Sequence, residues 1–202
     1  MTQEEKAVRQ KAEQGDAEIQ QSLGYAYMAG EGVPLDYGEA QKWLRKAADQ
    51  ANAAGQYNLA FLYGNGLGVP QNLSEAAKWL QKAADQGYVL AQGDLGAMYF
   101  SGGSVPQDFA EAVKWLLKAA DEGLPSSQGM LGEAYVSGKG VRPDNVEALS
   151  WYNLASTRAS GDDQGKFAAE RESLIARMTP AEITEAQKRT ADWLAAFEKR
   201  RR

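Results

Sequence analysis

The sequence repeats itself with a period of 36 residues. Tryptophan stands at positions 43, 79, 115 and 151, and each of these positions lies 36 residues after the one before. Six other residue types keep the same spacing: Leu23, Leu59, Leu95, Leu131; Tyr27, Tyr63, Tyr99, Tyr135; Gln20, Gln56, Gln92, Gln128; Gly30, Gly66, Gly102, Gly138; Val33, Val69, Val105, Val141; and Ala40, Ala76, Ala112, Ala148. A fixed period of this length is typical of proteins that stack copies of one small structural unit.

Each copy carries the pattern of two helices. In the first copy, Ile19, Leu23 and Tyr27 recur at steps of four residues, which places them on one helix face. After a glycine-rich stretch, a second helix is predicted over 37–48, with an apolar face made of Ala40, Trp43, Leu44 and Ala47. Small residues are expected where the two helices approach closely: Gly24, Ala60, Gly96 and Gly132.

The glycine-rich stretch 64–70, with the sequence GNGLGVP, raises the question of a phosphate-binding loop. Its counterparts stand at 30–34, 102–106 and 138–141, and none of them contains the lysine followed by serine or threonine of a P-loop. The glycines are therefore expected to end the first helix of each copy in a left-handed turn, and the proline to prevent its continuation.

This pattern resembles the Sel1-like repeat, a subfamily of the tetratricopeptide-like superfamily. The resemblance rests on a first helix with small residues, a G-x-G-V-P turn and an A-x-x-W-x-x-K-A-A second helix, as in Ala40–Ala48. It implies an all-α fold, a right-handed α-solenoid of four 36-residue helix-turn-helix repeats with helical caps. The repeats are predicted at about 16–51, 52–87, 88–123 and 124–160.

The ends of the chain are expected to cap the stack. Residues 1–15 are predicted to form an N-terminal capping helix, and residues 161–202 to form C-terminal capping helices. The residue register ends beyond 161, and a helix is predicted over 166–177. Thr179, Pro180 and Glu182 then form the signature of a helix start with a capping box.

Composition argues against several function classes. The net charge of -5 and the pI of about 5.0 disfavour nucleic acid as the partner. The chain has no cysteine and no histidine, which removes thiolate and imidazole catalysis and nearly every zinc site. Neither the S-x-x-K and K-T-G motifs nor a Walker A motif occurs. We therefore expect a non-enzymatic protein without cofactor or metal.

No apolar run is long enough to span a membrane, so membrane insertion is not expected. The first residues lack the apolar stretch of a signal peptide. The sequence as given therefore indicates a cytoplasmic protein, and a periplasmic or exported one if a signal peptide has been removed. The resemblance is to repeat proteins found widely in bacteria, with signalling, envelope or host-interaction roles.

Positions that differ among the copies indicate where a partner would bind. In the tetratricopeptide-like arrangement the first helices line a concave groove, and several of their varying positions carry large apolar side chains. The predicted partner-binding residues are Tyr25, Met28, Tyr57, Phe61, Asn65, Phe100, Ser101 and Glu133. Gly93 and Gly129 are expected to leave room for the ligand.

The leading hypothesis is a scaffold that binds a peptide or protein segment in this concave groove. Clustered aromatic side chains favour it, because such clusters usually mark a contact surface. The alternative is a structural module that self-assembles through the ends of the solenoid or its convex face. The oligomeric state stays open, with a monomer as the expectation.

Overall fold

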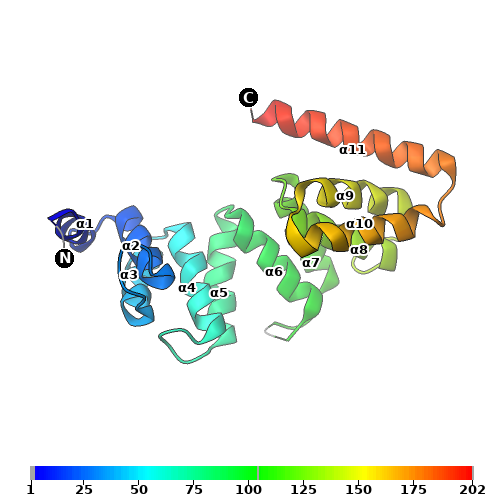
Figure 1. The fold of residues 1–202 in the computed structure, drawn as a ribbon. Coiled ribbons are helices and arrows are strands. Elements are labelled where there is room, and N and C mark those ends of the chain that lie inside the picture. Colours follow the sequence, from blue (N-terminus) through cyan, green and yellow to red (C-terminus); the bar gives the residue numbers. More distant parts are fainter. Residues whose placement is uncertain (1–2, 104, 202) are drawn as a thin grey trace. The chain divides into compact units, whose positions relative to one another are not determined.

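The computed structural model describes residues 3–103 and 105–201, and within these residues it contains eleven α-helices and no strand (Figure 1). The first helices of the four copies are α2 (Ala17–Ala29), α4 (Ala53–Asn65), α6 (Val89–Ser101) and α8 (Pro125–Ser137). The second helices are α3 (Tyr37–Asp49), α5 (Leu73–Asp85), α7 (Phe109–Asp121) and α9 (Asn145–Arg158). Before them lies α1 (Gln3–Glu13), and after them lie α10 (Gly161–Ile175) and α11 (Pro180–Arg200).

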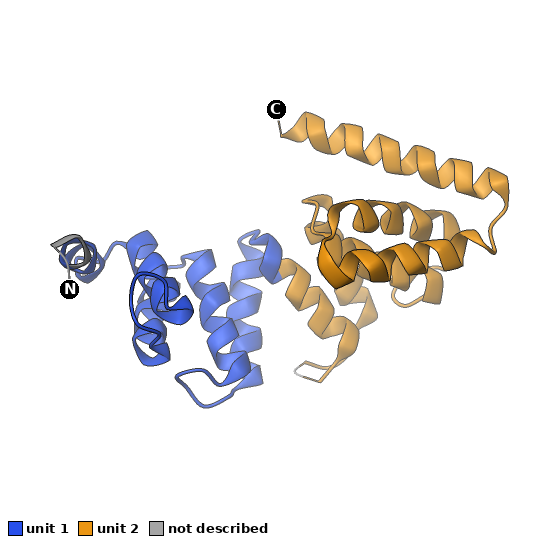
Figure 2. Cartoon of the chain, viewed as in Figure 1, with its two compact units in different colours: residues 1–91 blue, residues 92–202 orange. Residues whose placement is uncertain are grey.

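The chain divides into two compact units, which are described separately. Unit 1 covers residues 1–91 and unit 2 covers residues 92–202 (Figure 2). Within unit 1, α2 packs on α3 and α4 packs on α5; within unit 2, α8 packs on α9 in the same way. The second helix of one copy also packs on the first helix of the next, as α3 does on α4 and α7 on α8.

The glycine-rich stretches are turns, as predicted. The first helix of copies one, two and four ends at a glycine in the left-handed conformation, namely Gly30, Gly66 and Gly138. The backbone N–H of each caps the helix; that of Gly30, for instance, donates to the carbonyl of Ala26. An aspartate or asparagine then accepts backbone N–H groups at the start of the second helix: Asp36, Asn72, Asp108 and Asp144.

Glycine is needed inside the first helices, where the two helices of a copy come close together. A Cβ added at Gly24 would lie 2.6 Å from Leu44 Cγ, and one added at Gly96 would lie 2.8 Å from Leu116 Cγ. Real Cβ atoms do not approach other atoms this closely. The predicted close approach at these positions is confirmed.

The repeated glutamine joins consecutive copies. Gln20 donates from Nε2 to the carbonyl of Ala12 at 2.8 Å, and Gln56 donates to the carbonyl of Ala48 at 3.1 Å. The side-chain oxygen of each of these two amides accepts one hydrogen bond. Gln50 donates to Gln20 Oε1 and Gln86 donates to Gln56 Oε1, both at 2.7 Å. At each of these borders in unit 1, a buried glutamine amide therefore uses both its N–H donor and its carbonyl acceptor.

The same glutamine in copy four, Gln128, is only half used. Gln128 donates to the carbonyl of Ala120 at 3.1 Å, but its buried Oε1 has no hydrogen-bond partner among the described residues. The position that supplies the donor in unit 1 is Glu122 here. A carboxylate has no N–H to donate, so the substitution accounts for the unpaired oxygen.

The residue register ends beyond 161 as expected, but the helical period continues for one more helix. Helices α8 and α10 begin at Pro125 and Gly161, again 36 residues apart, so the predicted helix over 166–177 starts five residues earlier. Only the side-chain pattern is lost. α10 packs on α9 as the first helix of a further copy would.

Helix α11 does not form a hairpin with α10 but packs along α9 (Figure 1). Ala186 of α11 and Leu174 of α10 share a core cluster with Leu149 and Tyr152 of α9. The start of α11 is as predicted: Thr179 Oγ1 accepts the backbone N–H of Glu182, and the Glu182 carboxylate accepts that of Thr179 at 2.8 Å. This capping box fixes where the final helix begins.

Candidate interaction surface

The first helices of unit 1 expose two aromatic rings. Tyr25 on α2 is 42% exposed and Phe61 on α4 is 46% exposed, and the two occupy the same position of their repeats. The two helices contact each other. Neither helix contains a lysine or an arginine, and Glu18 is the single acidic residue in them. The face is therefore aromatic and nearly uncharged.

Three more predicted residues lie on these helices, and they are less free. Tyr57 is half-buried, and its ring centroid lies 5.1 Å from that of Tyr88. Met28 is half-buried as well. Asn65 is exposed, but its side-chain amide donates to the carbonyl of Phe61 at 2.9 Å and so completes the end of its own helix.

Unit 2 corrects the prediction of an exposed ring at Phe100. This residue is only 8% exposed and belongs to the core cluster around Leu116 and Leu131. Its ring meets that of Phe109 edge to face, with the centroids 5.4 Å apart, and the ammonium of Lys139 lies 5.0 Å from its centroid. Met28, at the same repeat position in copy one, is half-buried.

The two glycines that were expected to leave room for a ligand are already covered by side chains of unit 2. A Cβ added at Gly93 would lie 2.5 Å from Leu124 Cδ2 and 2.9 Å from Ser127 Oγ. Beside Gly129 lies the ring of Phe167 from α10. These glycines admit the chain's own side chains, so the expectation is wrong for Gly93, whereas Gly129 also lines a cavity beside Phe167.

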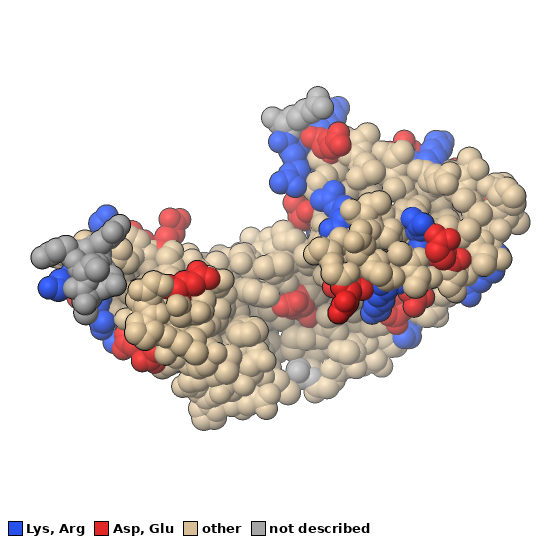
Figure 3. All heavy atoms as spheres, viewed as in Figure 1, with Lys and Arg blue, Asp and Glu red and all other residues tan. Residues whose placement is uncertain are grey.

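The other predicted residues of unit 2 are exposed. Ser101 donates from Oγ to the carbonyl of Ala97 at 2.8 Å, within its own helix. Glu133 forms an ion pair with Lys139 at 3.3 Å. In Figure 3, acidic and basic side chains lie beside one another over unit 2, whereas the face of unit 1 in view is mostly uncharged.

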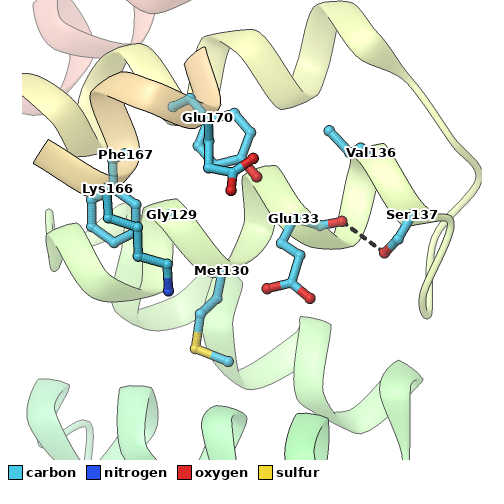
Figure 4. Close-up of a pocket in the computed structure, with 9 residues that line it drawn as sticks. Gly129, Met130, Glu133, Val136, Ser137, Lys166, Phe167 and Glu170 are labelled. Atoms are coloured by element: carbon cyan, nitrogen blue, oxygen red, sulfur yellow. Dashed lines mark hydrogen bonds between the residues drawn. The ribbon is translucent and has the colours of Figure 1, made fainter. Parts of the chain in front are cut away.

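A cavity of about 140 Å³ lies between α8 and α10 (Figure 4). Four of its lining residues occupy α8 positions that vary among the copies: Gly129, Glu133, Val136 and Ser137. The opposite side comes from α10, and Tyr152 of α9 completes the lining. Sequence reasoning missed the α10 side, although Gln164 stands 36 residues after Gln128 and could have shown that the period continues.

Tyr152 is the buried polar group of this cavity. Burial raises the pKa of its phenol well above the usual value, and the negative charges of Glu170 and Glu133 raise it further. The phenol oxygen therefore lies within the field of both carboxylates and stays protonated at neutral pH.

The described part of the chain lacks two further kinds of site. No group of three or more aspartate, glutamate, histidine or cysteine side chains there is arranged to hold a metal ion. Among the helices of residues 3–103 and 105–201, none is long and apolar enough to cross a membrane.

The repeats match a known family. The Sel1 repeat family model matches residues 18–52, 53–88, 89–124 and 125–160. The chain belongs to the Sel1 repeat family. Sel1 repeat proteins commonly act as scaffolds for protein interactions.

Solved structures agree with this assignment. A Sel1 repeat protein from Oxalobacter formigenes is 28% identical, with a TM-score of 0.71 over 87% of this chain and 74% of that one. The protein c5321, a protective antigen of uropathogenic Escherichia coli, is 30% identical, with a TM-score of 0.61. The alignment covers 94% of this chain but only 48% of c5321, so the chain spans about half the length of that antigen.

A Sel1 repeat protein from Klebsiella pneumoniae, at 22% identity and a TM-score of 0.53, shares the fold. A search of curated proteins returned no match.

Proposed function

We propose that this Sel1 repeat protein is a non-enzymatic scaffold that binds a peptide or protein segment on the first-helix face of unit 1. Tyr25 and Phe61 are the anchors. The observation that carries the proposal is their equivalent, exposed placement on adjacent helices that lack basic residues. Exposed aromatic side chains contribute more to binding than most other residues when a partner covers them.

The titratable groups support a role without catalysis. The chain has no histidine and no cysteine. The pKa of Glu39 is lowered by hydrogen bonds from Lys42 and Trp43, and that of Glu182 by the hydrogen bonds of its capping box. The pKa of Arg189 is raised by bonds to Glu147 and Glu185. Each of these shifts has a structural cause, and none leaves a group ready to exchange protons near neutral pH.

The test begins with a peptide selected against the folded chain from a random display library. Its affinity is then measured by calorimetry for the parent and for the Tyr25→Ala/Phe61→Ala double variant. We expect the double variant to bind at least about 30-fold more weakly, as loss of one hot-spot residue of about 2 kcal/mol would give. Both side chains are exposed, so the variant should keep its helical circular dichroism.

Leu73→Ala is the matched control. Leu73 is an apolar residue of unit 1 with 44% exposure, but it lies on α5, a second helix. Its removal should change the affinity by less than about twofold, as expected for a surface residue outside the contact. Equal affinity of the parent and a folded double variant would refute the assignment of the surface.

A further inference from the structure

The cavity between α8 and α10 contains a polar atom that nothing in the described chain satisfies. Tyr152 is only 4% exposed, and its hydroxyl forms no hydrogen bond with any residue the structure describes. The hydroxyl oxygen is accessible from the cavity, so a water molecule or a ligand with a hydrogen-bonding group can satisfy it there.

The charges that act on this hydroxyl are mainly negative, with Arg177 acting in the opposite direction. Glu133 from α8 and Glu170 from α10 line the same cavity, and both carboxylates act on the Tyr152 phenol (Figure 4). Glu170 has no ion-pair partner among the described residues. Glu133 pairs with Lys139, whose Nζ lies 3.3 Å from Glu133 Oε1. Carboxylate and phenol oxygens all accept hydrogen bonds from an ammonium group.

The rest of the lining is largely apolar. Phe167, Met130 and Val136 contribute a ring, a thioether and a branched side chain. The volume of about 140 Å³ is several times the roughly 10–15 Å³ that one water molecule needs in the same measure. It leaves room for a side chain such as that of lysine, with four carbons and one nitrogen beyond its Cα.

We propose that the cavity binds an alkylammonium group, supplied by a lysine side chain of an extended peptide. The methylenes lie against Phe167 and Met130, and the ammonium donates to Glu133, Glu170 and the phenol oxygen of Tyr152. The peptide as the source of the lysine rests on the proposed function; the ammonium site itself does not.

Lys166 also lines the cavity, and its removal tests the sign of the charge that the ligand carries. It is exposed and forms no ion pair with Glu133 or Glu170. Its positive charge opposes a bound ammonium, so its removal should strengthen binding. If the cavity instead bound an anion, removal of the Lys166 charge would weaken binding, and removal of the Glu133 or Glu170 charge would strengthen it.

The test uses n-butylammonium chloride as the probe and methionine methyl groups labelled with ¹³C as reporters. Met130 lines the cavity, whereas Met28 lies in unit 1 and serves as an internal reference. We expect a saturable shift of the Met130 methyl resonance with n-butylammonium and none with n-butanol, which has the same length but no charge.

Charge variants establish the contacts. Glu170→Gln and Glu133→Gln should each weaken n-butylammonium binding about fivefold, and Lys166→Ala should strengthen it about twofold, in line with partly exposed ion pairs. Glu172→Gln is the matched control, because Glu172 is an exposed carboxylate of α10 that does not line the cavity. Equal binding by all four variants, or an equal response to n-butanol, would overturn the ammonium site.

A second pair of probes distinguishes the source of the ammonium. The blocked tripeptide alanine-lysine-alanine should shift the Met130 resonance at least as strongly as n-butylammonium, and the norleucine analogue should not. Binding of the free amine without the peptide would overturn the lysine assignment. Tyr25→Ala/Phe61→Ala should leave the Met130 shift unchanged, so failure of this site and failure of the unit 1 surface are separate results.

Discussion

The tryptophan of the last copy, Trp151, has different surroundings from the tryptophans of the copies before it. The ring of Trp115, in the same unit, is still covered by Lys118, whose Nζ lies 3.8 Å from its centroid. In unit 1, the ring of Trp79 is covered by cations: Lys82 Nζ lies 3.9 Å from its centroid and the guanidinium of Arg45 lies 5.1 Å away. In unit 2, the equivalents of these two residues for Trp151 are Leu154 and Leu117. There the ring meets Trp193 of α11 edge to face, with the centroids 6.4 Å apart.

A third position completes the difference. Lys78 on α5 corresponds to Ser150 on α9, and Ser150 Oγ lies 3.2 Å from the carbonyl of Ala186 on α11, to which it donates a hydrogen bond. Ala186 is fully buried. One helical frame therefore supports either a solvent-facing surface or a docking surface for another helix, and three side chains decide between them.

The largest effect is expected from Ser150→Lys, which restores the residue of the other copies. Ser150 is buried, so the lysine would place an unpaired charge between α9 and α11. We expect a loss of about 3 kcal/mol in the free energy of unfolding, or release of α11. Urea denaturation measures the first, and faster proteolysis within residues 180–200 measures the second.

Lys78→Ser in copy two is the reciprocal control. Lys78 is exposed and pairs with Glu75 at 3.3 Å. Its loss should change the free energy of unfolding by less than about 0.5 kcal/mol. If the two substitutions had equal effects, the three-residue explanation of the difference between the copies would be wrong.

A smaller effect is expected at the glutamine borders. Glu122→Gln supplies an N–H donor for the unpaired Oε1 of Gln128 and should stabilise the protein by about 1 kcal/mol. Gln86→Glu removes the bond to Gln56 in unit 1 and should destabilise it by about the same amount. The shift of the urea midpoint at constant slope measures both, and shifts of the same sign would contradict the interpretation.

The smallest effect is expected from Lys82→Ala, which uncovers the Trp79 ring. The cation–π contact is exposed to solvent, so its loss should cost about 0.5 kcal/mol. The intrinsic fluorescence of Trp79 should shift to longer wavelength as water reaches the ring. Gln81→Ala, on the same helix, is the control, and an equal shift in that variant would show that the lysine does not cover the ring.

Most of the fold follows from the sequence, because the period fixes which residues face the core. The turns, the close approach at Gly24 and the capping box of α11 are all confirmed. Each depends on residues within one copy or in the copy beside it. Local pattern is sufficient in such cases.

The site was less predictable, because exposure depends on the neighbours that a position meets. Phe100 occupies a varying position, yet Phe109 and Lys139 cover it. Helix α10 keeps the backbone period but, of the repeated side chains, only Gln164, so the covering of Gly129 by Phe167 was indicated by that one residue alone. A partner-binding role for the predicted residues remains a prediction.

The hydrogen bonds at the unit 1 borders have a consequence for how the gene could change length. Each links residues only within one copy or across one border, such as Gln56 to Ala48 and Gln86 to Gln56. Duplication of the segment 53–88 in frame would therefore create one new junction, at which the carbonyl of Ala84 takes the place of that of Ala48 for the second copy of Gln56. We expect the protein with this insertion to fold without a compensating mutation. An insertion of another length would disrupt the hydrogen bonds at the border where it is placed.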